Sequence, residues 1–88
     1  MTHDERNRCR VCGLLLEPAP WGDDGRSPSF EFCLCCGAEW GYQDHTPEGA
    51  RNYREQWLQR GGEWDQPNQR PPDWDRERQL SAIPADYR

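Results

Sequence analysis

Two short stretches decide the fold of this chain: residues 9–13 are CRVCG and residues 33–37 are CLCCG. Each contains two cysteines that are separated by two residues and followed by glycine. Two intervening residues let one tight turn direct both sulfurs at a single ion, about 2.3 Å from each sulfur for zinc. Glycine after the second cysteine permits a positive φ, which a Cβ atom would oppose. The pattern predicts two metal-binding turns, named here the first and second knuckle, that together form a four-cysteine site.

The second knuckle contains three cysteines, so its ligands have to be chosen. Pairing Cys33 with Cys36 keeps two intervening residues and places Gly37 directly after the ligand, whereas pairing Cys33 with Cys35 gives a tighter loop. We therefore expect one ion to be held by four ligands: Cys9, Cys12, Cys33 and Cys36. Cys35 then lies inside the turn as a small space-filling or solvent-facing side chain. Redox sensing or metal exchange is the other interpretation of Cys35, and both need an accessible thiolate.

The sequence predicts a structural rather than a catalytic site. Four thiolates complete a tetrahedral set, whereas a catalytic zinc keeps one open position. His3 lies in the N-terminal arm and His45 in a loop, and we expect neither to be a ligand. No nucleophile–base arrangement, phosphate-binding glycine loop or dinucleotide fingerprint is found, so we expect a protein without enzymatic activity.

The composition favours one small domain that needs its metal. Hydrophobic residues make up 33% of the 88 residues, and a chain of this length buries a modest fraction of its surface. A structural zinc contributes on the order of 10 kcal/mol of binding free energy, which is coupled to folding. We expect a metal-stabilised α+β domain at residues 9–88, preceded by a flexible arm at residues 1–8.

The first half of the domain is predicted to be a ribbon. Residues 14–17 form a short apolar run typical of a strand, and residues 29–32 alternate polar and aromatic side chains as a half-buried strand should. The loop at residues 18–25 would join them into a zinc-ribbon-like β-hairpin that brings the knuckles together. A third strand or an extended return is expected at residues 38–42. The predicted four-cysteine ribbon core therefore covers residues 9–42.

One main helix is predicted at about residues 47–60. Thr46 is a favourable N-cap and Pro47 fits the first helical position, while the glycines at 61–62 tolerate the left-handed φ of a helix end. The apolar face that recurs at helical spacing consists of Ala50, Tyr53, Trp57 and Leu58.

The remaining residues, 61–88, are expected to form an irregular aromatic tail that packs over the domain. Its composition favours an unfolded chain. Its large apolar side chains argue for packing, and they are Trp64, Trp74, Leu80 and Ile83. Within this tail Asp73 or Asp75 is expected to cap a short helix that runs through Leu80 and stops before Pro84.

Charge limits the classes of partner. Eleven basic residues, all arginine, stand against sixteen acidic ones, giving a net charge of −5. A nucleic-acid-binding ribbon normally presents a basic face, and only Arg8 and Arg10 flank the site closely, where we expect them to screen the thiolates. The N-terminus has no apolar run, so neither a signal peptide nor a membrane span is predicted. Five cysteines fit a disulfide framework poorly, and the expected location is the cytoplasm.

The chain resembles the bacterial cysteine-rich CPCC proteins over most of its length. The stretches that carry the resemblance are 9–13, WGDDGRSPSFE at 21–31, CLCCG at 33–37, EWGY at 39–42, the helix around 53–57 and the tail around 74–80. The Cys-Pro-Cys-Cys that gives the family its name is Cys33-Leu34-Cys35-Cys36 here, which relaxes one φ angle and leaves every sulfur in place. The resemblance implies small size and metal binding.

These observations lead to three hypotheses of function. The first is a non-enzymatic zinc protein whose surface binds another protein, and its size and acidic charge extend this to an immunity-type protein that neutralises a toxin. The second is a rubredoxin-like electron carrier with iron in the same four-cysteine site. The third and weakest is a nucleic-acid-binding zinc ribbon. The sequence leaves the identity of the partner and the oligomeric state open.

Overall fold

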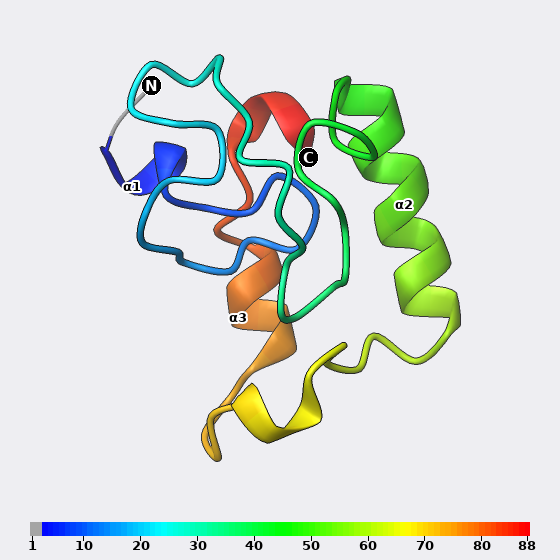
Figure 1. The fold of residues 1–88 in the computed structure, drawn as a ribbon. Helices are drawn as coiled ribbons and strands as arrows, with labels where there is room; N and C mark the ends of the chain where they lie inside the picture. Colours follow the sequence, from blue (N-terminus) through cyan, green and yellow to red (C-terminus); the bar gives the residue numbers. More distant parts are fainter. Residues whose placement is uncertain (1–2) are drawn as a thin grey trace.

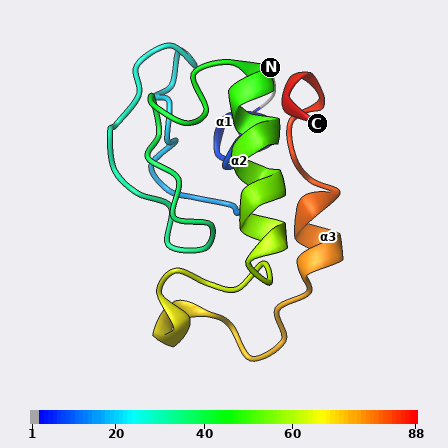
Figure 2. The same cartoon turned by 90° about the vertical axis from the view of Figure 1, so that its right-hand side faces the viewer.

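The computed structural model describes residues 3–88, which fold around the two knuckles. The described helices are α1 (His3–Arg6), α2 (Pro47–Gln59), the 3-10 helix η1 (Pro67–Gln69), α3 (Arg76–Leu80) and the 3-10 helix η2 (Ala85–Tyr87). Residues between α1 and α2 are loops and turns that carry both knuckles (Figure 1). The tail continues from α3 to η2, which lies beside α2 near the start of that helix (Figure 2).

The predicted α+β class and its zinc-ribbon β-hairpin are both wrong. The described residues contain no strand and only two isolated antiparallel bridges, between Arg8 and Leu15 and between Phe32 and Glu39. Each extended segment pairs across its own knuckle: the Leu16 amide donates to the Asn7 carbonyl at 2.6 Å, and the Trp40 amide donates to the Glu31 carbonyl at 3.0 Å. The segments 14–17 and 29–32 are therefore not partners, and the two knuckles meet through their sulfurs.

Residues 29–32 are not half-buried as predicted, because all four of them are exposed. A half-buried strand would turn its phenylalanines to the core, but Phe30 is 59% exposed and Phe32 is 61% exposed, while Cys33 is fully buried. The thiols occupy the interior at this place, and the aromatic rings lie outside. Residues 38–39 form the extended return, after which the chain turns through residues 40–44.

The main helix is confirmed. The Thr46 hydroxyl accepts a hydrogen bond from the Gly49 amide at 3.0 Å, and Pro47 occupies the first turn. Gly61 and Gly62 follow the helix with φ of 110° and 60°. On the apolar face, Ala50 and Trp57 are buried and Tyr53 is half-buried, as expected. Leu58, assigned to the same face, is 38% exposed because it lies at the edge of the stripe.

The short tail helix is also confirmed at Arg76–Leu80, with the Asp75 carboxylate accepting from the Arg78 amide at 3.2 Å. Trp64 and Ile83 are buried, whereas Trp74 and Leu80 are partly buried. Of the arm at 1–8, the first two residues lie outside the described part and the next four form α1. The flexibility of that arm stays a prediction.

The core is built largely from sulfur and small side chains. All five cysteines are buried, and they form one cluster with six further buried residues: Val11, Ala38, Trp40, Ala50, Trp57 and Trp64. Helix α2 contributes Ala50 and Trp57 to this cluster, and the tail contributes Trp64. Helix α2 and the tail therefore pack against the knuckles and complete the core.

Candidate metal centre

The two knuckles have the same backbone geometry, 24 positions apart in sequence. In the first, the Gly13 amide donates to the Cys9 carbonyl and the Cys9 amide to the Leu14 carbonyl, both at 2.9 Å. In the second, Gly37 donates to Cys33 at the same distance, and Cys33 donates to the Ala38 carbonyl in the same way. Gly13 and Gly37 have φ of 86° and 79°, conformations that glycine adopts without strain. The motif therefore folds locally, as its spacing predicts.

The structure brings together the four cysteines chosen from the spacing. Their sulfurs all lie within 4.8 Å of one another. The Sγ atoms of Cys9 and Cys36 are 3.8 Å apart, and those of Cys12 and Cys33 are 3.6 Å apart. Four sulfurs placed tetrahedrally around an ion at about 2.3 Å would be about 3.8 Å apart. The donor set and its spacing therefore fit a metal ion, whose identity they do not distinguish.

Burial and hydrogen bonding shift the pKa values of these thiols in opposite directions. Burial raises the pKa of Cys12 and of Cys36, because a buried thiolate loses its hydration. Burial acts the same way on Cys9, but hydrogen bonds from the neighbouring thiols and from the Trp40 indole, 3.4 Å from the Cys9 sulfur, lower its pKa overall. A bound cation removes the conflict, because it deprotonates coordinating thiols outright.

Cys35 lies outside this group of four but is also fully buried. It occupies the place in the second knuckle that Val11 occupies in the first, and Val11 is likewise buried. The Nε2 of Gln79 lies 3.4 Å from its sulfur. The expected space-filling role matches this position, whereas the expected solvent-facing alternative does not. Of the histidines, His45 is exposed in the loop before α2, and the side chain of His3 lies outside the described part.

Carbonyl groups at equivalent places in both knuckles accept hydrogen bonds from the rest of the fold. In the first knuckle, the Arg54 guanidinium donates to the carbonyls of Arg10 and Val11, at 3.0 and 2.5 Å. In the second, the backbone amides of residues 65 and 66 donate to the carbonyls of residues 35 and 34, at 2.8 and 3.0 Å. The Arg54 side chain of α2 therefore supplies hydrogen-bond donors to the first knuckle, and the tail backbone supplies the equivalent donors to the second.

The carbonyls of the second cysteine in each knuckle are also bonded. Gln79 of α3 donates from Nε2 to the Cys12 carbonyl at 3.2 Å, and Tyr53 of α2 donates from its hydroxyl to the Cys36 carbonyl at 3.3 Å. The packing of α3 on the first knuckle is close, since a Cβ on Gly13 would fall 2.2 Å from the Gln79 carbonyl oxygen. Gly13 is thus required both for its φ and for its lack of a side chain.

Sequence reasoning missed Arg54 and Gln79 as supports of the site. A signal for Arg54 was available, because it shares a helical face with Ala50 and Trp57, where an unpaired cation would be costly. Burial lowers the pKa of Arg54, while the nearby Cys9 and Cys12 oppose that shift. As a cation, Arg54 offsets negative charge at the cluster.

Arg10 does not face the cluster as a screening charge. It is 7% exposed, and its guanidinium carbon lies 3.9 Å from the ring centre of Trp21 and 4.5 Å from that of Tyr87. This stack ties the first knuckle to the loop and to the C-terminal end of the chain. The Trp21 indole in turn donates to the buried carboxylate of Asp44 at 2.8 Å. Arg10 therefore has a packing role here.

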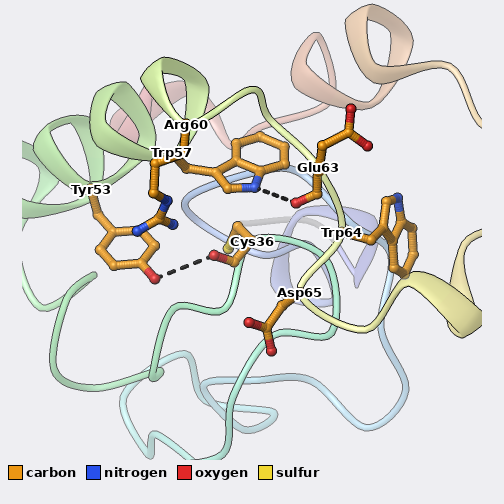
Figure 3. Close-up of a pocket in the computed structure, with 7 residues that line it drawn as sticks. All are labelled: Cys36, Tyr53, Trp57, Arg60, Glu63, Trp64 and Asp65. Carbon is orange, nitrogen blue, oxygen red and sulfur yellow. Dashed lines mark hydrogen bonds between the residues drawn. The ribbon is translucent and has the colours of Figure 1, made fainter.

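A pocket of about 340 Å³ lies between α2 and the start of the tail. Its lining residues, drawn in Figure 3, are Cys36, Tyr53, Trp57, Arg60, Glu63, Trp64 and Asp65. Within it the Trp57 indole donates to the Glu63 carbonyl at 2.8 Å (Figure 3), fixing the tail to the helix. Cys36 lines the pocket but is only 1% exposed, so the thiol is nearly closed off from solvent.

Comparisons with known proteins leave the family open. No family model, curated protein or solved structure matches the chain. The resemblance to the CPCC proteins stays a prediction from the motifs. None of the helices in residues 3–88 has the length and apolar character needed to cross a lipid bilayer.

Proposed function

We propose that this chain is a non-enzymatic protein in which four buried cysteines hold one structural zinc ion. The four ligands are Cys9, Cys12, Cys33 and Cys36. The observation that supports the proposal is the cluster of these four sulfurs within 4.8 Å, each at most 1% exposed. A complete and enclosed set of four thiolates leaves no coordination position for a substrate, which is typical of structural zinc.

The proposed role of the folded protein is to bind another protein. Small size, a net charge of −5 and exposed large apolar side chains support this role, as they do an immunity-type function against a basic toxin. The free thiols would be retained in a reducing compartment, and we place the protein in the cytoplasm. Membership of the bacterial CPCC proteins is part of the same proposal.

A rubredoxin-like electron carrier with iron in the same site is the second candidate. The hydrogen bond from the Trp40 indole to the Cys9 sulfur would have a function in such a carrier, because donors to cluster sulfurs tune the reduction potential of iron–thiolate centres. Both ions accept four thiolates, so the choice of zinc is an expectation about use.

Metal analysis together with an absorption spectrum tests the proposal. The full chain, purified under reducing conditions without added metal, should contain one zinc per molecule and be colourless. The Cys36→Ser variant should lose the metal, because three thiolates remain. A red protein with thiolate-to-iron charge-transfer bands would favour the electron carrier, and a metal-free folded protein would refute both candidates.

A further inference from the structure

Four of the six large apolar side chains that are exposed in residues 3–88 lie in residues 30–42, the segment that contains the second knuckle and its flanks. They are Phe30 at 59% exposed, Phe32 at 61%, Leu34 at 42% and Tyr42 at 72%. We call these four residues the aromatic face. The other large exposed apolar side chains among the described residues are Leu15 and Leu58. Several exposed large apolar side chains in one short segment need an explanation, because surface apolar side chains are usually scattered singly.

The backbone around the second knuckle places these side chains on a rigid support. Cys33 and Ala38 are fully buried, and a hydrogen bond joins their backbones at 2.9 Å. Phe32 lies opposite Glu39 across the bridge, so their side chains are neighbours on the outer side. A Cβ on Gly41 would fall 2.8 Å from the Phe30 ring, which therefore rests on the Gly41 backbone beside Tyr42.

Phe30 adopts an unusual backbone conformation. Its φ of 60° lies in the left-handed region, and it is the one non-glycine residue with positive φ among the described residues. That conformation is a genuine outlier for a bulky side chain. Such strain persists where the surrounding structure enforces it, and it is concentrated at functional sites. The outlier coincides with an aromatic ring that the fold leaves uncovered.

The segment that carries the aromatic face contains acidic residues but no arginine or lysine. Residues 27–50 contain no arginine or lysine, whereas Arg8 directly precedes the first knuckle and Arg10 lies within it. Glu31 and Glu39 flank the phenylalanines, and neither forms an ion pair within residues 3–88. Nucleic acids and anionic lipid surfaces would be repelled by such a face, and a second copy of the chain would bring the same acidic residues against it.

We propose that the aromatic face binds a basic segment of another protein. Apolar side chains of the segment cover Phe30 and Phe32, while its arginine or lysine side chains pair with Glu31 and Glu39. Burying aromatic rings supplies affinity, and the unpaired carboxylates select cationic partners and speed their association. This inference rests on the proposed role in protein binding and does not depend on which metal fills the site.

Two synthetic peptides test it: one alternates leucine with arginine, and its counterpart alternates leucine with glutamate. Each is titrated into the isotopically labelled full chain, with backbone amide shifts as the readout. The arginine peptide should shift amides in residues 29–43, and the glutamate peptide should leave them unmoved. The Phe32→Ala and Glu39→Gln variants should weaken binding by roughly fivefold to tenfold. Leu58→Ala, which removes an exposed apolar side chain on α2, should leave affinity unchanged.

Several outcomes would overturn the proposal. Equal binding of both peptides, shifts centred outside residues 29–43, or no binding of either peptide would each do so. Sedimentation that shows a dimer abolished by Phe32→Ala would assign the face to a second copy of the chain. Metal content measured on the same samples separates the two claims: full zinc with no peptide binding refutes the docking face alone, and absence of zinc refutes the proposed metal centre.

Discussion

The Arg54 guanidinium donates to two carbonyls of the first knuckle. The backbone amides of Asp65 and Gln66 donate to the two equivalent carbonyls of the second knuckle. Arg54 also donates to the Tyr87 carbonyl at 2.5 Å. A planar cation with several fixed N–H donors suits this task better than a single ammonium. The sequence predicts the cysteines because their spacing is local. It does not predict this donor, because the carbonyls that Arg54 bonds are more than thirty residues away.

Replacing Arg54 with alanine should therefore lower the free energy of unfolding by at least about 2 kcal/mol, since buried carbonyls that lose a donor cost about 1–3 kcal/mol each. Chemical denaturation of the metal-loaded protein measures this. Arg54→Lys should recover only part of the loss.

The control is Arg51→Ala, one turn earlier on α2. Arg51 is exposed, and its guanidinium donates a hydrogen bond to the Arg88 carbonyl at 3.2 Å. Its removal should change stability by less than about 0.5 kcal/mol. If Arg51→Ala and Arg54→Ala cost the same, the assigned role of Arg54 is wrong.

The comparison of the two knuckles also makes a prediction for Cys35. Because Val11 fills the equivalent place, Cys35→Val should keep one metal ion per molecule and change stability by less than about 1.5 kcal/mol. Cys36→Ser should release the metal. Metal analysis of both variants is the measurement, and metal loss in Cys35→Val combined with retention in Cys36→Ser would show that the ligand had been wrongly chosen.

At the scale of elements, local signals predicted α2 well and the strands poorly. The cap at Thr46, the proline at 47 and the paired glycines after the helix all act within a few residues. Strand formation depends on a pairing partner, and alternation alone cannot identify it. Here each extended segment forms a single bridge across its own turn. The period-2 alternation in residues 29–32 therefore did not indicate burial.

Helix α2 is held to the core chiefly by Trp57, which is 2% exposed. Trp57→Ala should lower the unfolding free energy by about 3–5 kcal/mol, the usual cost of removing a large buried aromatic side chain. It would also free the Glu63 carbonyl that the indole bonds. Leu58→Ala, the neighbouring exposed position, should cost far less. A shift of a few tenths of a kcal/mol in Trp57→Ala would contradict the burial of that face.

For the whole molecule, the knuckles replace a conventional hydrophobic core. Five of the eleven residues in the buried cluster are cysteines, and hydrophobic residues are 33% of the chain. Below about 70–80 residues a hydrophobic core alone seldom supplies more than about 3–5 kcal/mol, and this domain is only slightly longer. Helix α2, α3 and the backbone amides of residues 65 and 66 all donate to knuckle carbonyls, whose positions depend on the sulfurs being drawn together.

Removing the metal should therefore unfold the protein rather than leave a folded chain with an empty metal site. Without a cation the burial that raises the pKa of Cys12 and Cys36 leaves protonated thiols in the interior, and the binding free energy, on the order of 10 kcal/mol, is lost from folding. Treatment with a chelator under reducing conditions should abolish the helical circular dichroism of α2 and the slow amide exchange of both knuckles.

Protons compete with the metal for the thiolates, so lowering the pH should release the metal as well, and metal binding should weaken steadily as pH falls. Adding back zinc at neutral pH should restore the fold, and the reductant excludes disulfide formation as the cause of any failure. A chelated protein that keeps its thermal transition unchanged would mean that side-chain packing, and not the metal, holds the knuckles in place.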